Sequence, residues 1–299
     1  MSKTIIDLHL HSTHSDGKLT PPQIVKKLTQ AKVNFASLTD HDSTAGSSEF
    51  NALAGKAGIK TISGTEISAD QHGIGIHILG YGINTGNRRL LGLFKKQSAA
   101  RRKAFDKYVA MFKKAGFIIN KNKYGEFRKI KSVARTHVFR LIWEEPQNRE
   151  LCFKKYRFKG TGWLQSEFIN AFMELPGQLA YAKKKNILAK KAIELIHKAG
   201  GIAVWAHPGI EIEFKNDKTL NKVFKSLVSH GIDGVEAFST ARSLTKERSK
   251  YLCKLAHKHD LIATIGTDDH DGTRIGTLKI PLKYHLEALE KLHQKLTSK

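Results

Sequence analysis

TIIDLHLH at residues 4–11 starts a pattern that sets the fold class of this chain. Its side chains alternate between apolar and polar after a β-branched start, which is typical of a strand that presents polar groups at its end. An amphipathic helix is predicted at 21–33, where a Thr-Pro start precedes apolar residues at helical spacing. FASLTDHD at 35–42 has the pattern of a second short strand that ends in charged residues. This β-α-β order predicts a mainly parallel α/β sheet or barrel.

The alternation continues over most of the chain. Further helices are predicted at 44–57, 187–199, 218–230 and 243–259, and strands at 59–67, 74–81, 201–207, 232–238 and 261–267. Between these halves the pattern is helical, with one long basic helix predicted at 88–131 and short helices up to residue 180. We therefore expect an α/β barrel domain made of residues 1–83 and 181–299, and a helical insertion, or cap, at 84–180.

The composition predicts an anionic partner. The 299 residues carry 51 Lys and Arg against 27 Asp and Glu, a formal net charge of +24. Residues 88–131 supply more than half of this excess, with 15 Lys and Arg against 2 Asp and Glu. Nucleic acid, a membrane surface or a small phosphorylated substrate would each be attracted to such a surface.

Other classes of protein are disfavoured. No apolar run approaches the roughly 18 residues of a membrane span, and the N-terminus lacks the apolar stretch of a secretory signal. The two cysteines lie about a hundred residues apart and make no disulfide framework. The sequence therefore predicts a cytoplasmic protein that does not contact membranes, and it leaves the oligomeric state open.

Imidazoles and carboxylates gather at the predicted strand ends. They are His9, His11, Asp16, Asp40, His41, Asp42, Glu66, His77, His207, Glu236, Asp268, Asp269, His270 and Asp271. Because the carboxyl ends of parallel strands share one face of the fold, we expect these side chains to meet in one cleft. His9 and His11 lie on the same side of their strand and can share one metal ion. A group rich in His, Asp and Glu without thiolates suits Zn²⁺, Mn²⁺ or Fe²⁺.

The motifs around these residues carry a family resemblance. They are DLHLHSTHSDG (7–17), SLTDHDS (37–43), GTEIS (64–68), IHILGYG (76–82), VARTHV (133–138), WAHPG (205–209) and GTDDHDG (266–272). In this order they resemble the PHP (polymerase and histidinol phosphatase) family, and most closely its branch with ribonuclease AM and nucleoside 3′,5′-bisphosphate phosphatase. The resemblance implies a distorted seven-stranded β/α barrel, similar to a TIM barrel, with a helical insertion.

The resemblance also implies a centre of two or three divalent ions, which would be Mn, Fe or Zn. In its three-metal form, the first ion would be held by His9, His11, Glu66 and Asp268. The second would be held by Glu66, His77 and His137, with Glu66 as a bridge, and the third by Asp16, His41 and His270.

The implied chemistry is hydrolysis of a phosphate ester. Metal ions lower the pKa of bound water toward about 7, and the resulting hydroxide would attack phosphorus in line. His207 would face the phosphate as a ligand, a hydrogen-bond donor or a general acid. Asp42 would steer His41 or relay a proton, and Arg135 would bind phosphate oxygens with its planar donors.

The basic insertion bears on the substrate. Arg101 and Arg102 are predicted to contact a terminal phosphate, and the surrounding charge would attract RNA in a salt-dependent way. The alternative is a solvated, amphipathic cap. At 143–166, the aromatic residues Tyr156, Phe158 and Trp163 interleave with Lys and Arg, which favours either base stacking or a half-buried helix face.

Several polar residues lie outside the implied ligand set. Asp269 and Asp271 depart from the family pattern, and their charge would either tighten metal binding or repel phosphate. Histidines on predicted basic helices are expected to be solvated: His197, His230, His257, His259, His285 and His293.

Three functions follow from these observations. The leading hypothesis is a metal-dependent phosphoesterase that acts on nucleotides or short RNA, either as a nucleoside 3′,5′-bisphosphate phosphatase or as a 5′-3′ exoribonuclease. A phosphatase of the histidinol-phosphate type uses the same chemistry, but the Arg-x-His element and the insertion argue against it. A catalytically idle nucleic-acid-binding PHP protein is a third possibility, and the complete set of ligands argues against it.

Overall fold

The structure is a computed structural model that describes residues 4–160, 164–182, 186–208, 217–240 and 244–298. Its strands are β1 Ile6–Leu10, β2 Phe35–Leu38, β3 Lys60–Thr61, β4 Gly64–Gln71, β5 Ile74–Tyr81, β6 Ile187–Leu188, β7 Ile202–Trp205, β8 Gly234–Phe238 and β9 Ile262–Ile265. Its helices are α1 Pro21–Gln30, α2 Ser47–Lys56, α3 Arg88–Lys114, α4 Lys121–Lys129, α5 Arg135–Trp143, α6 Pro146–Lys154, α7 Leu164–Phe172, α8 Ala189–Lys198, α9 Asp217–Ser229, α10 Lys246–Lys258 and α11 Leu282–Thr297.

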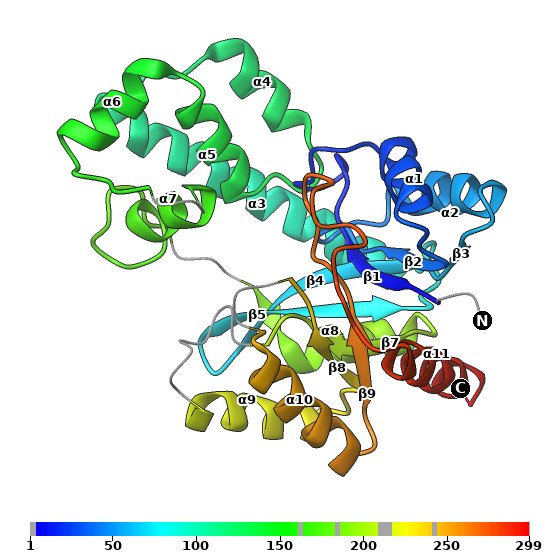
Figure 1. Ribbon diagram of the computed structural model, residues 1–299. Coiled ribbons are helices and arrows are strands. Elements are labelled where there is room, and N and C mark those ends of the chain that lie inside the picture. Colours follow the sequence, from blue (N-terminus) through cyan, green and yellow to red (C-terminus); the bar gives the residue numbers. More distant parts are fainter. Residues whose placement is uncertain (1–3, 161–163, 183–185, 209–216, 241–243, 299) are drawn as a thin grey trace. The chain divides into compact units, whose positions relative to one another are not determined.

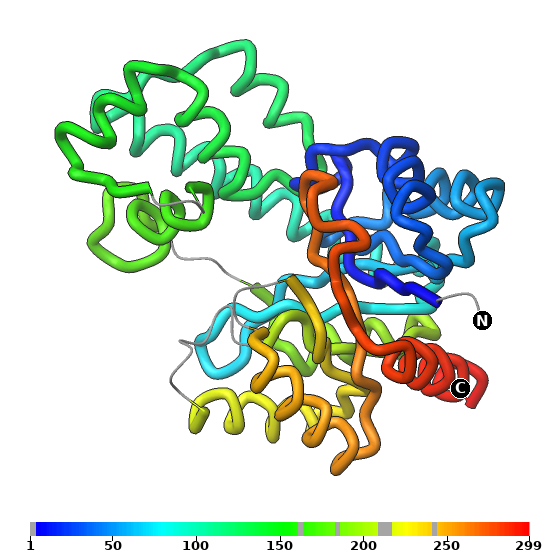
Figure 2. The backbone as a smooth tube through the Cα atoms, viewed as in Figure 1, coloured from blue at the N-terminus to red at the C-terminus, as the bar shows by residue number. Residues whose placement is uncertain are grey.

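The chain divides into two compact units. The first is Met1–Phe94 with Asn186–Lys299, and the second is Lys95–Lys185. Both ends of the sequence build the first unit, as the blue-to-cyan and yellow-green-to-red parts of the tube show (Figure 2). The start of α3 belongs to this unit, where Leu90, Leu93 and Phe94 are buried in its core. The assignment of 84–180 as a cap domain stays a prediction.

The first unit contains two sheets. β1, β2 and β3 pair in parallel, and the second sheet has the order β6-β4-β5-β7-β8-β9. β5 is antiparallel to β4 and β7, whereas the other pairs of this sheet are parallel. Isolated bridges join Leu10 to Asp269 and His41 to Glu66, so the two sheets meet at these points. The predicted α/β class is confirmed, and β5 is the exception to the parallel arrangement.

A tight turn explains why β5 reverses. His72 and Gly73 connect β4 to β5 with φ angles of 58° and 79°. Left-handed turn residues match the twist of a hairpin, and Gly73 adopts this conformation without a steric cost. The N–H of Gly73 also donates a hydrogen bond to Asp70 Oδ1 at 2.9 Å. A parallel pair needs a crossover of a dozen or more residues, for which this connection is too short.

Helices cover the second sheet of this unit. α8 packs on β5 and β7, α10 packs on β8 and β9, and α11 packs on β9 (Figure 1). In α8, Ala192, Ile193 and Ile196 are fully buried, and each large aliphatic side chain contributes about 1.5–3 kcal/mol. Gly80 of β5 lies under this helix, because a Cβ there would come within 3.0 Å of Ile196 Cγ1.

One histidine that the sequence predicts to be solvated is buried, and a second is paired and partly exposed. His285 of α11 is 1% exposed, and its Nδ1 accepts a hydrogen bond from Ile6 N–H at 3.3 Å. His197 of α8 lies 2.7 Å from Asp233 Oδ2 through its Nε2. The prediction that His285 is solvated is wrong, because a basic helix also has an inner face and the sequence does not show which distant group meets it. The side chain of His197 keeps 33% of its surface exposed.

The second unit has its own core of helices. α3, α4, α5, α6 and α7 surround aromatic and aliphatic side chains that include Phe112, Phe158 and Phe168. The single helix predicted at 88–131 is wrong, since α3 ends at Lys114 and Gly116 follows with a φ of 97°. Phe158 is buried in this core and Tyr156 packs against it, which supports the half-buried alternative for the 143–166 segment. Trp163 lies outside the described residues.

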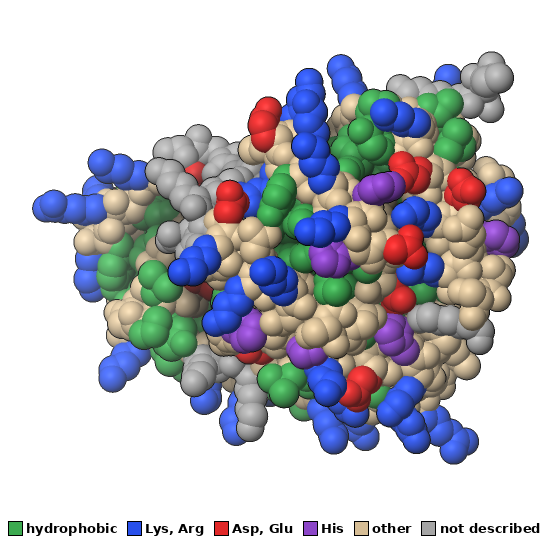
Figure 3. Space-filling model, turned by 90° about the horizontal axis from the view of Figure 1, so that it is seen from below, with side chains coloured by type: hydrophobic (Ala, Val, Ile, Leu, Met, Phe, Trp, Pro, Cys, Tyr) green, Lys and Arg blue, Asp and Glu red, His purple; other side chains and the backbone are tan. Residues whose placement is uncertain are grey.

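The described helices include no membrane-spanning candidate. Each is too short or too polar to cross a bilayer. The longest, α3, extends over 27 residues but is rich in Lys and Arg. Lys and Arg dominate the charged side chains on the face shown in Figure 3, as the net charge of +24 leads one to expect.

Candidate metal centre

Two histidines from the first strand begin a buried cluster in the first unit. His9 lies within β1 and His11 directly after it, and their ring centroids are 5.1 Å apart. Only 0% and 1% of these residues' surfaces are exposed. Alternation along the strand therefore places two imidazoles on one side, as the sequence predicts.

Glu66 lies at the middle of the cluster. It is the third residue of β4, and it is fully buried. Its carboxylate oxygens lie 2.8–3.4 Å from ring nitrogens of five histidines, namely His9, His11, His41, His77 and His207. One carboxylate thus faces imidazoles that come from four different parts of the chain.

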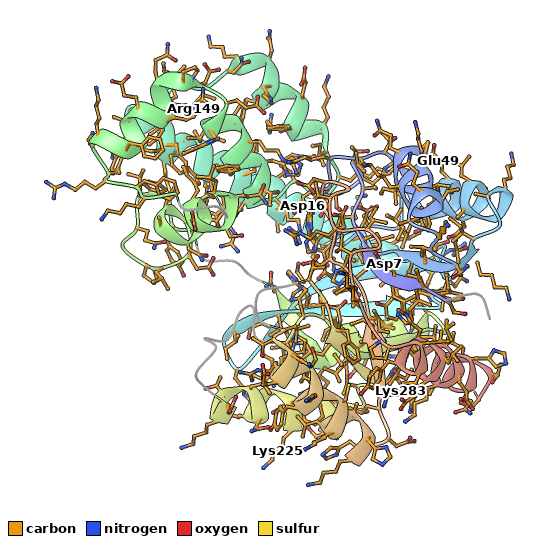
Figure 4. The ribbon with its side chains drawn as sticks, viewed as in Figure 1. Asp7, Asp16, Glu49, Arg149, Lys225 and Lys283 are labelled. Carbon is orange, nitrogen blue, oxygen red and sulfur yellow. The ribbon has the colours of Figure 1, made fainter. Side chains whose placement is uncertain are left out.

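Asp268 and Asp16 add two further carboxylates. Asp268 Oδ1 lies 3.4 Å from His9 Nε2 and 3.2 Å from His11 Nε2. Asp16 Oδ1 lies 3.2 Å from His270 Nε2. Figure 4 shows Asp16 among nitrogen-bearing side chains in the interior of the first unit.

The potential ligand atoms form three overlapping groups, and within each group the atoms lie within 4.8 Å of one another. The groups are His11, Asp16, His41 and His270; His9, His11 and Glu66; and His41, Glu66 and His77. His11, His41 and Glu66 each belong to two groups, so ions bound in them would share ligands. This arrangement is typical of a polynuclear centre.

The chemistry of these atoms fits divalent ions. Within the described residues, four buried atoms of the cluster have no hydrogen-bond partner, namely His9 Nε2, His11 Nε2, His41 Nδ1 and Glu66 Oε2. Buried polar atoms in folded proteins are normally paired. Imidazole nitrogens and carboxylate oxygens are the ligands of Zn²⁺, Mn²⁺ and Fe²⁺, and coordination would pair all four atoms.

The pKa values in the cluster reflect its opposite charges. Burial opposes a charge on Glu66, but the imidazoles of His41 and His77 hold its pKa well below the ordinary value. Burial likewise opposes a charge on His11, yet the nearby carboxylates of Asp268 and Glu66 raise its pKa to about 10. Burial lowers the pKa of His77. The converging carboxylates therefore favour positive charge between them, which a divalent ion also supplies.

Asp40 holds the loop between His11 and Asp16. Its Oδ1 accepts hydrogen bonds from Ser12 N–H at 2.7 Å and from the Ser15 hydroxyl at 2.6 Å. Its Oδ2 accepts one from the Ser12 hydroxyl at 2.7 Å. This carboxylate thus organises the segment that links two predicted ligands.

Asp7 holds the segment before Asp268 by hydrogen bonds, as Asp40 holds the loop between His11 and Asp16. Its carboxylate accepts hydrogen bonds from Thr267 N–H at 2.9 Å and from the Thr267 hydroxyl at 2.7 Å. Burial raises the pKa of Asp7 to about 7. Figure 4 shows this residue inside the first unit. No local pattern in the sequence distinguishes Asp7 as a support of the cluster, although its spacing of two from His9 places it on the same side of β1.

Asp269 and Asp271 bond within their own loop. The Asp269 carboxylate accepts hydrogen bonds from Gly272 N–H at 2.5 Å and Arg274 N–H at 2.9 Å. Asp271 Oδ1 accepts one from the Thr273 hydroxyl at 2.5 Å. These contacts shape the loop that carries Asp268 and His270, which is a structural use that the sequence analysis does not foresee.

The residues predicted to act in catalysis have different surroundings. His207 Nε2 lies 2.9 Å from Glu66 Oε1 and 3.3 Å from His77 Nδ1, where a metal ligand would lie. Asp42 Oδ1 accepts a hydrogen bond from Ser68 N–H at 3.0 Å, which ties the segment after β2 to β4.

Four predicted residues belong to the second unit. Arg135 pairs with Glu174, and the Nδ1 of buried His137 accepts a hydrogen bond from a backbone N–H at the start of α5 at 3.0 Å. Arg101 and Arg102 are partly buried on α3. Their roles toward a phosphate or a second ion stay predictions.

Comparison with known proteins gives the family. A profile described as "PHP domain" matches residues 7–297. The chain belongs to the PHP domain family.

Two curated relatives of this PHP chain are similar over most of its length. A 5′-3′ exoribonuclease of Haemophilus influenzae is 32% identical over 270 residues, which are 88% of this chain and 89% of that protein. A 3′,5′-nucleoside bisphosphate phosphatase of Chromobacterium violaceum is 29% identical over 271 residues, 89% of this chain and 87% of that protein.

A solved structure shares the fold. It is an amidohydrolase from Chromobacterium violaceum with bound sulfate, with a TM-score of 0.74, 26% identity and coverage of 90% of this chain and 88% of that one. The predicted family and branch are confirmed by these matches. The predicted reaction class, hydrolysis of phosphoric esters, agrees with the names of the relatives and is confirmed as well.

Proposed function

We propose that this PHP chain is a metal-dependent phosphoesterase that hydrolyses phosphate esters of nucleotides or short RNA. The observation that carries the proposal is the buried Glu66 carboxylate, which faces five histidines and belongs to two of three overlapping ligand groups. The relatives named as a bisphosphate phosphatase and an exoribonuclease support the class of substrate.

The proposal includes a distorted (β/α)7 barrel in the first unit. The bridges from Leu10 to Asp269 and from His41 to Glu66 support it, because they link β1 to the segment after β9 and the segment after β2 to β4. The strands would then pair in a closed ring of seven, in the order β1, β2, β4, β5, β7, β8 and β9. In such a barrel the ligands from separate strands lie at one end. Residues 84–180 would form the cap domain between β5 and β6.

Three ions, Mn, Fe or Zn, would fit the centre. His9, His11, Glu66 and Asp268 would hold the first, and Asp16, His41 and His270 the third. Glu66 and His77 would hold the second, and the distances of His207 from both favour His207 as a further ligand beside the predicted His137.

When bound, the ions lower the pKa of water and neutralise charge on phosphoryl oxygens. The chain positions them: Asp40 and Asp7 hold the ligand loops by hydrogen bonds, and Asp42 anchors β4 at Ser68. His207, which is 3% exposed, would hold a proton for the leaving oxygen if it is not a ligand. Contacts of Arg101, Arg102 and Arg135 with phosphate oxygens complete the proposal.

A cytoplasmic location belongs to the same proposal. Cys152 and Cys253 are both free thiols, which suits a reducing compartment.

A substrate panel tests this function. The purified protein, supplied with Mn²⁺, Fe²⁺ or Zn²⁺, is assayed with adenosine 3′,5′-bisphosphate, a 5′-phosphorylated RNA oligomer and histidinol phosphate. We expect metal-dependent turnover of one or both of the first two substrates. The substitution His41→Ala should abolish turnover and leave RNA affinity within about twofold, because it removes a ligand and no phosphate contact. Turnover of histidinol phosphate alone, or RNA binding without turnover with any ion, would overturn the proposal.

A further inference from the structure

A second buried carboxylate, Glu236, contacts the cluster but belongs to none of its three ligand groups. It lies in β8, which pairs with β7 on one side and β9 on the other, and it is 0% exposed. Within the described part of the chain its carboxylate has two hydrogen-bond partners, the His9 ring and the backbone of His207. Because a buried charge is costly unless it is paired, these two contacts explain how Glu236 is tolerated.

The first contact orients His9. Glu236 Oε1 lies 3.0 Å from His9 Nδ1, and accepts the ring's Nδ1–H. The opposite nitrogen, Nε2, lies 3.4 Å from both Glu66 Oε2 and Asp268 Oδ1. A ring that donates from Nδ1 presents a lone pair on Nε2, and carboxylates in this position also make the ligating nitrogen more basic.

The second contact holds the backbone at His207. Glu236 Oε2 accepts a hydrogen bond from His207 N–H at 2.8 Å. His207 has a φ of 26°, a strained conformation that residues with a Cβ rarely adopt. The hydrogen bond offsets this strain at the residue whose Nε2 lies 2.9 Å from Glu66 Oε1.

Gly266, directly after β9, leaves the space that the His9–Glu236 pair requires. A Cβ at this position would lie 2.8 Å from Glu236 Oε1 and 2.3 Å from His9 Cβ. A larger residue would therefore push the two side chains out of contact. The sequence thus combines a carboxylate on β8, an imidazole on β1 and a glycine after β9 to make one hydrogen bond.

We propose that Glu236 is a positioning residue that fixes two histidines of the cluster at once, the ligand His9 through its ring and His207 through its backbone. The inference rests on the proposed function only in taking the cluster as a metal centre. Glu236 would act without touching the ions or the phosphate. Its removal should weaken metal binding about 10–100-fold, as the loss of an outer partner of a metal-bound histidine does.

The test compares two isosteric variants of the full chain. Glu236→Gln removes the charge that orients His9. The matched control, Asp233→Asn, removes the carboxylate of the residue directly before β8, which contacts His197 Nε2 and Ala203 N–H, each at 2.7 Å, and not the cluster. Mn²⁺ affinity is measured by calorimetry, and the thermal midpoint of unfolding is recorded for each protein. In the Zn²⁺-loaded protein, ¹⁵N shifts of the His9 ring report its tautomer.

We expect Glu236→Gln to lose Mn²⁺ affinity by 10–100-fold and to lose the single Nδ1–H tautomer of His9. Asp233→Asn should keep wild-type affinity even if its unfolding midpoint falls. Glu236→Asp, which keeps the charge on a shorter side chain, should recover part of the affinity, and it replaces the Gln variant if that one does not fold.

Equal Mn²⁺ affinity in wild type and the Glu236 variants would overturn the inference and leave the phosphoesterase proposal intact. Phosphoester turnover is measured in parallel. A wild-type protein that binds Mn²⁺ but turns over no phosphoester would overturn the proposed function, and the affinity comparison would still decide the role of Glu236.

Discussion

Asp40 should stabilise the first unit by an amount that the number of its hydrogen bonds determines. Three donors from Ser12 and Ser15 converge on its carboxylate, which is 2% exposed. Asp40→Ala leaves these donors without their acceptor, and each buried unpaired donor costs about 1–3 kcal/mol. Because the two hydroxyls can turn toward other acceptors, we expect a total loss of about 3–5 kcal/mol in the free energy of unfolding.

Asp40→Asn should cost much less. The amide oxygen keeps both bonds to Oδ1, from Ser12 N–H and the Ser15 hydroxyl, and the amide nitrogen can donate to the Ser12 hydroxyl. We expect a loss of about 1 kcal/mol, which is the difference between a charged and a neutral acceptor.

Urea-induced unfolding measures both changes. The control is Asp260→Asn, because this aspartate is 90% exposed and lies 3.5 Å from Lys291, and Asn tolerates its left-handed φ of 50°, so the change should alter the free energy by less than about 0.5 kcal/mol. If Asp40→Ala and Asp40→Asn differ by less than about 0.5 kcal/mol, the hydrogen bonds to this carboxylate do not hold the loop and the reasoning fails.

Three other predictions concern the ions and the substrate. Glu66→Gln should reduce the bound metal to at most one ion per chain, because Glu66 belongs to two of the three ligand groups. Elemental analysis measures this metal content, and the control Asp70→Asn on the same strand should leave it unchanged. Mn²⁺ binding at pH 8 should release protons and strengthen as pH rises, because the pKa of His11 is about 10 without metal. Calorimetry in buffers of different ionisation enthalpy detects the released protons. A binding enthalpy that does not depend on the buffer would contradict the prediction. Replacing Arg101 and Arg102 by Gln should raise KM for an RNA oligomer more than for a small phosphomonoester, and equal effects would exclude contacts specific to the longer substrate.

Much of the fold follows from local patterns. The alternation in TIIDLHLH and the apolar spacing at 21–33 predict β1 and α1. α1 buries one side and exposes the other, whereas β1 is buried on both sides, because its polar residues Asp7 and His9 also lie inside the first unit. The reversal of β5 depends on a two-residue turn, His72-Gly73, which is not part of the β-α-β pattern. The end of α3 likewise depends on one glycine, Gly116, inside a strongly helical pattern.

The metal ligands are easier to predict from the sequence than the residues that hold them in place by hydrogen bonds. His9, His11 and Glu66 stand out because several imidazoles and carboxylates gather near the predicted strand ends, and the structure brings these three together. Asp7 and Glu236 lie inside strands, where a carboxylate is recognisable as a partner only when the residue across the fold is known. Contacts between residues far apart in sequence, such as Ile6 with His285, leave no local signal at all.

The most direct test of the central claim is anomalous diffraction from crystals of the Mn²⁺-loaded protein. We predict adjacent Mn²⁺ peaks on both sides of the Glu66 carboxylate, at coordination distance from His9 and His11 on one side and from His77 on the other. Crystals of active protein in which no Mn²⁺ contacts Glu66 would contradict the account.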